Sequence, residues 1–395
     1  MRALKIGPPG LSLTCLAKAA LLAGIFLGGC LSIPLDPTHT PGAPLPPRAS
    51  DTSFPLSPTP LPPTYTPSTA SSSTPVPTPL LPSATPSPWW FEQSFGSWEQ
   101  VLALAWSPDG KLLAASAGEH VYILDGGNFQ LLQTLEAGSW SDRLAFSPVP
   151  ISNIPYLLAA ASKDGRVQLW DASRGIQLSA WEAHQKGAKS AAFSPNSLWL
   201  VSSGGDAMVR LWDVQALLEK PAEKPTPLAE MIGGAYAIPD VSFSPDGSLV
   251  ASVDIHDIRL RDPATQRLVR TLRGSTSIFR IAFSPDGSKL AAAEMGNTLS
   301  LWDVATGELI ERRSASGGQA GDEKIFLWGL AFSPDGSRLA AGGSDGMVTL
   351  WAEDTGQVVQ RYLAHERAVT SLAFSPDGEF LASGSLDGNL RLWNQ

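Results

Sequence analysis

The stretch HERAVTSLAFSPDGEFLASGSLDGNLRLW, residues 365–393, decides the fold of this chain. It contains three short apolar runs, at 369–374, 380–383 and 389–393. Ser-Pro-Asp-Gly at 375–378 and Leu-Asp-Gly at 386–388 separate these runs, and such turns between apolar runs predict an antiparallel meander. A sheet this small has two exposed edges and little core, so one copy alone would be only marginally stable.

The chain contains seven copies of this unit. An aromatic residue followed by Ser-Pro marks each copy, and these aromatic residues are Trp106, Phe146, Phe193, Phe243, Phe283, Phe332 and Phe374. Each copy continues with small residues and an apolar run that ends near Trp-Asp, as at 170–171, 212–213 and 302–303. Self-similarity with a period of about 40 to 50 residues is typical of propellers and solenoids.

These motifs recur together and in order, and they resemble those of the WD-repeat β-propeller family over residues 89–395. The resemblance implies an all-β fold, a seven-bladed β-propeller of four-stranded antiparallel blades. The seventh copy stops after its third strand, and residues 91–95 align with an outer strand at 359–363. In that family an N-terminal strand completes the last blade and so removes two exposed strand edges. We therefore expect residues 91–95 to close the ring.

The resemblance also implies a buried polar tetrad in the blades that keep the full motif. Its members in the last copy are His365, Ser383, Asp387 and Trp393. A buried indole N–H needs an acceptor, which the resemblance assigns to the serine hydroxyl. The corresponding residues in the third copy are His184, Ser202, Asp206 and Trp212.

Other copies have lost part of the tetrad. The residues that replace its tryptophan or serine are Leu124, Ala160, Arg261 and Ala341. These blades must depend more on apolar packing, and we expect them to be less rigid than the third and the seventh.

The first thirty residues resemble a bacterial lipoprotein signal. Arg2, Lys5 and Lys18 precede the apolar run 19–29, which is too short to span a bilayer well. Leu-Gly-Gly-Cys at 27–30 resembles the lipobox, where cleavage precedes a cysteine that then carries acyl chains such as palmitate. We therefore expect a signal peptide at 1–29 and a lipid anchor at Cys30, on the outer side of a bacterial membrane. The alternative is an ordinary signal peptide with an incidental cysteine.

Residues 30–88 have the composition of a linker. After Cys30 this segment is rich in Pro, Thr and Ser, with too little apolar surface to offset the entropy lost on ordering. We expect a disordered tether, and at the polyproline rise its full extension would be roughly 180 Å. It acts as a plain spacer in the simplest interpretation, and as a wall-crossing segment or a glycosylated stalk in the alternatives.

The composition disfavours several classes of function. The formal net charge is −9 and no basic block is present, which argues against nucleic-acid binding. Both cysteines, Cys15 and Cys30, precede the repeats, so residues 89–395 have no disulfide and no thiolate metal site. The five histidines show no metal-ligand spacing and no phosphate loop joins a strand to a helix, so we expect neither metal nor cofactor.

The Ser, His and Asp residues of the tetrads invite a hydrolase interpretation, which we reject. The serine hydroxyl is expected to accept the hydrogen bond of the indole. The same group of Ser, His and Asp also occurs at equivalent positions in two copies. Residues 342–346 fit G-x-S-x-G, but they fall in a turn between strands, whereas that motif needs a strand-to-helix elbow. We therefore predict that the chain is not an enzyme.

Function is then expected to lie in a surface. The loops that precede the first strand of each blade, and those between its second and third strands, share the face that family members commonly use for partners. The longest of these loops, 314–324, leads into an aromatic pair. The candidate partner surface consists of Phe326, Trp328, Phe279, Lys189, Arg143 and Arg280. Aromatic and charged residues around a ring opening suit recognition, although the pair at 326 and 328 could instead pack under its own loop.

We predict a membrane-anchored, extracytoplasmic and monomeric propeller that acts as a protein-interaction scaffold or sensor module. The first alternative is a propeller that binds a carbohydrate or small molecule at the opening of its channel, for which Trp140, Trp199 and Trp328 are candidates. The second is an enzyme on a propeller scaffold, which would need acids or metal ligands at one end of the channel. A second insertion, 215–227, is expected to form a short helix and a Pro-rich loop.

Overall fold

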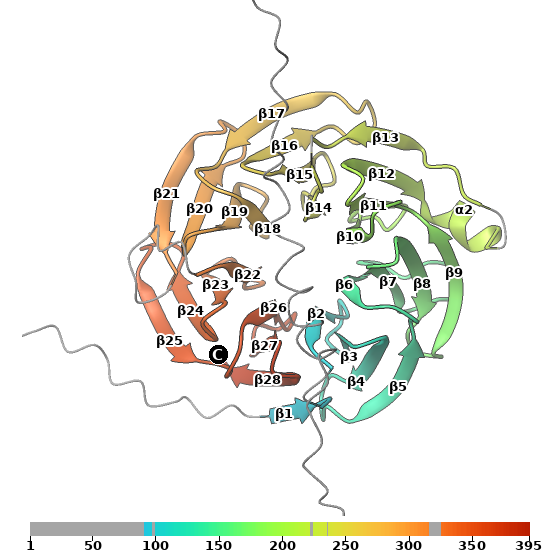
Figure 1. Cartoon of the computed structure of the whole chain (residues 1–395), viewed down its shortest axis with the longest axis horizontal. Helices are drawn as coiled ribbons and strands as arrows, with labels where there is room; N and C mark the ends of the chain where they lie inside the picture. The colour runs from blue at the N-terminus through green and yellow to red at the C-terminus, as the bar shows by residue number, and fades with distance from the viewer. Residues whose placement is uncertain (1–90, 97–98, 222–223, 235, 316–324) are drawn as a thin grey trace, which may run out of the picture. The chain divides into compact units, whose positions relative to one another are not determined.

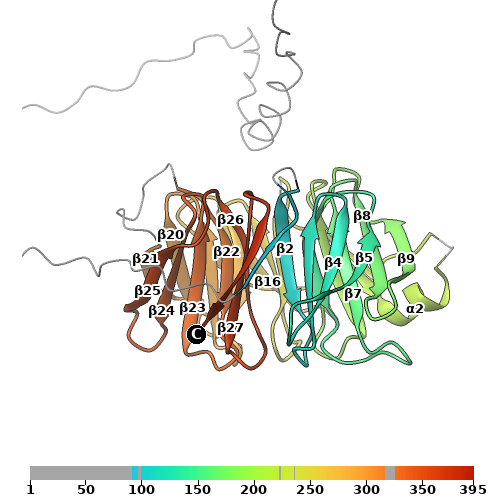
Figure 2. The same ribbon diagram turned by 90° about the horizontal axis from the view of Figure 1, so that it is seen from below.

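The computed structural model describes residues 91–96, 99–221, 224–234, 236–315 and 325–395. These residues form seven four-stranded antiparallel sheets in a ring, which confirms the seven-bladed propeller (Figure 1). Viewed from the side, the strands run between the two faces of the ring (Figure 2). The predicted signal peptide, Cys30 and the linker lie outside the described residues.

In each blade the strands follow one another from the centre of the ring to its rim. The inner strands are β2 (Val101–Trp106), β6 (Ser141–Phe146), β10 (Ala188–Phe193), β14 (Val241–Phe243), β18 (Ile278–Phe283), β22 (Leu327–Phe332) and β26 (Val369–Phe374). The second strands are β3 (Leu112–Ala117), β7 (Leu157–Ser162), β11 (Trp199–Gly204), β15 (Val250–Asp254), β19 (Lys289–Glu294), β23 (Arg338–Gly343) and β27 (Phe380–Ser385).

The outer half of each blade completes the sheet. The third strands are β4 (His120–Asp125), β8 (Arg166–Asp171), β12 (Met208–Asp213), β16 (Asp257–Arg261), β20 (Thr298–Asp303), β24 (Met347–Ala352) and β28 (Asn389–Asn394). The outer strands are β5 (Leu131–Glu136), β9 (Ile176–Glu182), β13 (Ala229–Ile232), β17 (Leu268–Arg273), β21 (Leu309–Ser314), β25 (Val358–Leu363) and, for blade 7, β1 (Phe91–Ser94). After β12 comes the expected short helix, α2 (Val214–Glu219), whose N-cap is Asp213.

The first strand of the described chain closes the ring. β1 pairs antiparallel with β28, so blade 7 has the order β1-β28-β27-β26 and contains both ends of the domain (Figure 1). Glu92 lies opposite Arg391, and their side chains form an ion pair of 2.7 Å. In blade 3 the register partners Arg210 and Glu230 form the same ion pair, also at 2.7 Å. β1 therefore takes the place that β13, a continuous part of the chain, takes in blade 3.

The hydrophobic core lies between neighbouring blades. One cluster joins Leu350 and Tyr362 of blade 6 to Leu372 and Trp393 of blade 7, where the Tyr362 and Trp393 rings are 4.3 Å apart. Another joins blade 7 to blade 1 and includes Phe91 of the closing strand. A blade therefore buries its faces only when both neighbours are present, and the ring must be complete to bury all of them.

The turns after the inner strands link the blades on one face. Gly110, Gly247, Gly287, Gly336 and Gly378 have φ between +72° and +76°, which glycine adopts without strain. A methyl group added at Gly110 would lie 3.6 Å from Pro376, in the corresponding turn of blade 7. The other four glycines face the proline of the preceding blade in the same way. The recurring Ser-Pro-Asp-Gly sequence thus makes contacts between blades as well as reversing the chain.

Deletion of residues 89–98 should leave β28 as an exposed edge and remove Phe91 from the core shared by blades 7 and 1. We expect a lower melting temperature and aggregation, because an unpaired strand edge is a template for association. A chain that begins at residue 89 is the control, since it keeps β1. Thermal unfolding and size-exclusion chromatography measure both effects. A monomeric deletion variant with an unchanged melting temperature would contradict closure by β1.

Candidate functional site

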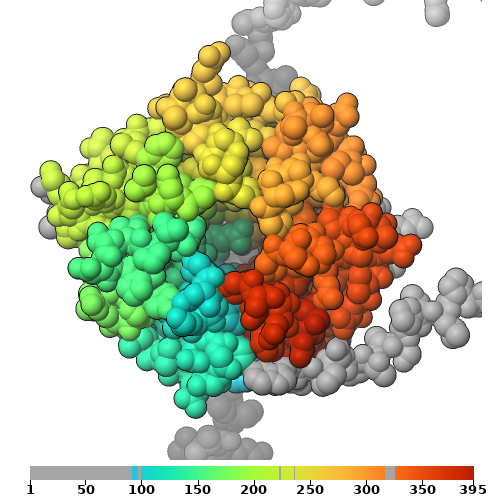
Figure 3. Space-filling view, turned by 180° about the vertical axis from the view of Figure 1, so that it is seen from behind, coloured from blue at the N-terminus to red at the C-terminus, as the bar shows by residue number. Residues whose placement is uncertain are grey.

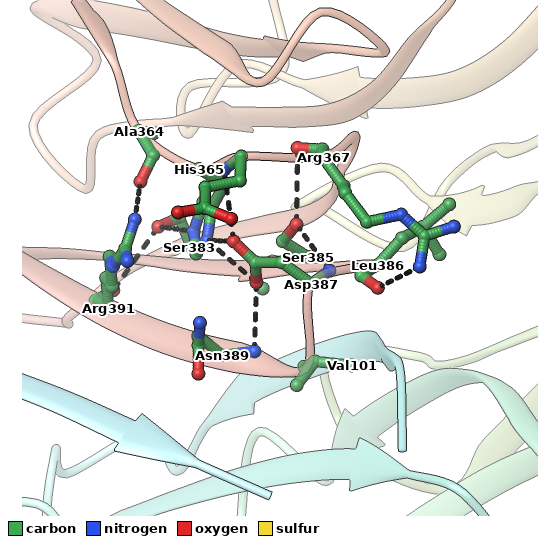
Figure 4. Close-up of polar contacts among 12 residues, drawn as sticks. Val101, Ala364, His365, Arg367, Ser383, Ser385, Leu386, Asp387, Asn389 and Arg391 are labelled. Atoms are coloured by element: carbon green, nitrogen blue, oxygen red, sulfur yellow. Dashed lines mark hydrogen bonds and ion pairs between the residues drawn. The ribbon is translucent and has the colours of Figure 1, made fainter. Parts of the chain in front are cut away.

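Blade 7 contains a buried tetrad. The Trp393 indole donates a hydrogen bond of 2.8 Å to Ser383 Oγ. His365 Nε2 lies 2.8 Å from the same oxygen (Figure 4). His365 Nδ1 lies 3.0 Å from Asp387 Oδ2. Burial favours the neutral carboxyl of Asp387, but its hydrogen bond with His365 and those from two backbone N–H groups hold its pKa at about 2. The structure thus brings together the four residues that the motif pointed to.

The tetrad of blade 3 includes an additional arginine. Trp212 donates to Ser202 Oγ over 2.9 Å, while His184 lies 2.8 Å from both Ser202 and Asp206. Arg210 Nη1 donates to Asp206 over 2.7 Å. Burial lowers the pKa of His184 although Asp206 favours its charged form. This network joins the second, third and outer strands to the loop before β10.

The tetrads resemble a catalytic triad in connectivity only. Ser202 and Ser383 are fully buried, and each hydroxyl accepts the indole hydrogen bond. A nucleophile must reach a substrate carbonyl, and these two oxygens have no exposed surface. Residues 342–346 span the end of β23 and the turn before β24, so G-x-S-x-G here joins two strands. These groups act as structural connections between strands.

The blades with an incomplete tetrad use two different substitutes. In blade 1, Leu124 is fully buried in the core shared with blade 7, as the expectation of apolar packing requires. In blade 4, a polar side chain adds to the apolar packing. Arg261 donates a hydrogen bond of 3.2 Å to Ser252 Oγ, the hydroxyl that corresponds to that of Ser383. It donates a second hydrogen bond, of 2.8 Å, to the Ile232 carbonyl. A guanidinium there replaces the indole donor and also bonds to the preceding blade.

The substitution Ser383→Ala should leave two buried groups, the Trp393 N–H and His365 Nε2, without their shared partner. We expect the free energy of unfolding to fall by about 1–3 kcal/mol. Ser300→Ala is a matched control, because Ser300 Oγ is buried in β20 and has no hydrogen-bond partner. Urea unfolding compares the two variants. Equal losses would show that the tetrad adds nothing beyond the packing of a buried serine.

The inner strands carry a second group of polar residues, around the hollow at the centre of the ring (Figure 3). We call this group, with the aromatic residues beside it, the channel mouth. Its members are Asp142, Arg143, Lys163, Lys189, Asp240, Phe279, Arg280, Phe326 and Trp328. They come from blades 2 to 6, and most lie near the start of an inner strand, opposite the Ser-Pro-Asp-Gly turns.

Asp240 connects four blades within the channel mouth. Its carboxylate is buried and receives two hydrogen bonds from Arg143, of 2.5 and 3.2 Å, across the width of blade 3. It also accepts from Ser190 Oγ at 2.8 Å and from the Ile281 N–H at 3.0 Å. Its acceptor positions are therefore occupied from blades 2, 3 and 5.

The second carboxylate of the channel mouth is shared by two lysines. Asp142 lies 3.2 Å from Lys189 Nζ and 3.8 Å from Lys163 Nζ. The Lys163 ammonium also lies 4.9 Å from the centroid of the Trp140 ring. Burial and the neighbouring Lys189 lower the pKa of Lys163, against the attraction of Asp142. One negative charge here faces two positive charges.

An aromatic row lies at the same end of the inner strands, in blades 5 and 6. The Phe279 and Phe326 rings are 6.0 Å apart and meet edge to face, and the Phe326 and Trp328 rings are stacked at 6.4 Å. Phe279 belongs to β18 and Trp328 to β22, so the row crosses from blade 5 to blade 6. All three residues are only partly buried. The loop 316–324, under which the pair at 326 and 328 could pack, lies outside the described residues.

The structure therefore brings the six predicted surface residues to one end of the channel. Sequence reasoning missed Asp240, which joins them. Asp240 is the residue before β14, and alignment of the inner strands would have placed it with Arg143, Ser190 and Arg280.

A separate cavity of about 540 Å³ lies between blades 5 and 6, near the turns of the opposite face. Lys289 and Glu353 line it and form an ion pair of 2.9 Å, and Arg313 lies 3.4 Å from the same carboxylate. Arg313 also forms an ion pair with Glu311, so each of these two cations has a carboxylate partner. The channel mouth differs because its positive charges outnumber its carboxylates.

The described part of the chain offers neither a metal-binding cluster nor a membrane-spanning helix. It contains no group of three or more His, Cys, Asp or Glu side chains arranged to hold a metal ion. None of its helices is long and apolar enough to cross a membrane.

Comparison with known families identifies matches in five segments. The family "WD domain, G-beta repeat" matches residues 91–125, 175–213, 266–303, 318–352 and 356–394. Four of these segments start in or near the outer strand of one blade and end with the third strand of the next. The first three strands of blades 2 and 4 are not matched, and these blades contain the substitutions Ala160 and Arg261.

Individual proteins show similarity over parts of the ring. Nuclear distribution protein PAC1 of Arthroderma benhamiae is 32% identical over 114 residues, 27% of this chain and 25% of that protein. Serine-threonine kinase receptor-associated protein of Mus musculus is 30% identical over 120 residues, 30% of this chain and 32% of that protein. Eukaryotic translation initiation factor 3 subunit I of Lodderomyces elongisporus is 25% identical over 181 residues, 41% and 49% of the two chains. The chain thus spans a quarter to a half of the length of these relatives.

Proposed function

Since five segments of this chain match the WD repeat family and the chain folds as a seven-bladed propeller, we propose that it is an interaction scaffold whose channel mouth binds a protein partner. The observation that carries the proposal is the partly exposed aromatic row Phe279–Phe326–Trp328, at the same end of the inner strands as Lys189 and Arg143. Aromatic residues and arginine supply most of the binding free energy at protein interfaces. The buried tetrads provide no accessible nucleophile that would favour an enzymatic role.

The similar proteins support the same class of function. One bears the name of a receptor-associated protein and another that of a subunit of an initiation factor, and both names describe components of assemblies. The similarity covers less than half of this chain, so it favours a mode of action and identifies no particular partner.

Trp328→Ala should weaken binding of the partner, because it removes one end of the aromatic row. Trp199→Ala is the matched control. Trp199 is a partly buried tryptophan at the start of β11, on the face of the ring opposite to the channel mouth. We expect chemical crosslinking and capture to recover the same protein with the wild type and Trp199→Ala, and at least tenfold less with Trp328→Ala. Equal recovery with both variants would place the partner elsewhere, and a carbohydrate or small molecule that alone raises the melting temperature would favour the alternative function.

We propose further that Cys30 carries a lipid anchor, so that the linker tethers the ring to the outer side of a bacterial membrane. The support is the lipobox-like sequence at 27–30 followed by the Pro-rich segment. Two or more acyl chains would make the attachment stable, whereas a single chain gives only reversible binding.

Cys30→Ser should abolish incorporation of labelled palmitate and move the protein from the membrane fraction to the soluble fraction. Cys15→Ser is the matched control, because Cys15 lies within the predicted signal peptide and should leave both readouts unchanged. Palmitate labelling that survives Cys30→Ser would contradict the anchor.

A further inference from the structure

Among the described residues, Arg280 has no acidic partner. It lies in β18 at the channel mouth, and the described residues place no carboxylate within ion-pair distance of its guanidinium. Its Nε is buried without a hydrogen-bond partner, and its one hydrogen bond runs from Nη1 to the carbonyl of Phe279 at 3.3 Å. Burial lowers the pKa of Arg280 to about 10, with the nearby Arg143 acting in the same direction. The side chain is therefore a charged group in a partly desolvated site.

The neighbouring acids cannot satisfy Arg280. Asp240 already accepts from Arg143, Ser190 and the backbone of Ile281, and Asp142 is shared by Lys163 and Lys189. Among the described residues, four positive side chains thus face two carboxylates, an excess of two positive charges in a chain whose net charge is −9. An excess of this sign is suited to an anionic ligand.

Arg143 shows what kind of anion fits. Arg143 uses its Nε and Nη2 to hold both oxygens of Asp240, which is the bidentate arrangement that matches a carboxylate. The Nη2 group of Arg280 has no acceptor among the described residues, and its Nε is buried. Phe279 directly precedes Arg280 at a β-bulge, so the aromatic row begins one residue from this guanidinium. The ligand should therefore combine a carboxylate with an adjoining apolar group.

We propose that the channel mouth binds an acidic residue of an extended peptide segment of the partner, and that Arg280 pairs with its carboxylate. The Phe279, Phe326 and Trp328 rings contact an apolar residue beside the acidic one. This inference rests on the proposed function and adds to it the chemistry of the recognised segment.

Selection from a displayed library of linear dodecapeptides tests the inference with the full chain. The wild type should enrich sequences in which Asp or Glu adjoins an apolar residue, whereas Arg280→Gln should lose that enrichment. Arg312→Gln is the matched control, because Arg312 is exposed on the outer strand β21 and its removal changes the net charge equally. Arg280→Lys keeps the charge without the planar pair of donors, so its loss should be intermediate.

A selected peptide then gives the quantitative result. Its affinity should fall at least tenfold with Arg280→Gln, and equally when its acidic residue is changed to Asn or Gln. The two changes together should cost no more than either one alone. Melting temperatures of the variants verify that each is folded.

Three results would overturn the inference. They are selected peptides without acidic residues, undiminished binding to Arg280→Gln, and displacement of the peptide by inorganic phosphate more readily than by acetate at equal ionic strength. Capture of a protein partner that depends on Trp328 but not on Arg280 would refute this inference alone and leave the proposed function standing. Peptide binding through Arg280 without any captured partner would contradict the proposed function and leave the inference about Arg280 standing.

Discussion

The pairing of β1 with β28 is the contact on which the rest of the structure depends. Each blade shares its core with both neighbours, so an open ring would expose apolar faces as well as two strand edges. The Glu92–Arg391 pair repeats the Arg210–Glu230 pair of an uninterrupted blade, which shows that the closing strand is held in the ordinary register. The contact of Gly110 with Pro376 joins the same two blades on the turn face.

Closure also explains why the blades tolerate different interiors. The full tetrads in blades 3 and 7 join strands through hydrogen bonds, while blade 1 uses Leu124 and blade 4 uses Arg261 for the same position. Because each blade is packed on two sides, the local network can change without loss of the ring. The inner strands also have side chains that are not part of the core between blades. Arg143, Asp240 and Arg280 lie there or directly beside these strands.

The sequence predicts the fold well because its information is local and repeated. Phe-Ser-Pro-Asp-Gly and Trp-Asp each specify a turn or a strand end within a few residues. Because the unit occurs seven times, the degenerate copies can be recognised by comparison with the complete ones. The closing strand was predictable because blade 7 lacked a fourth strand in its own copy. The channel ion pair was not predicted, because Arg143 and Asp240 are 97 residues apart and meet only through the curvature of the ring. The role of Arg261 was also missed, since a pattern does not show which donor a guanidinium can replace.

Hydrogen–deuterium exchange of the intact chain tests the closure most directly. β25 is the outer strand of blade 6 and occupies the position in its sheet that β1 occupies in blade 7. If β1 is an integral strand, peptides covering 91–96 and 389–395 should be protected to the same extent as those covering 358–363 and should open with the rest of the ring. Exchange of residues 91–96 within seconds, with 358–363 still protected, would show that the ring is not held closed by its first strand.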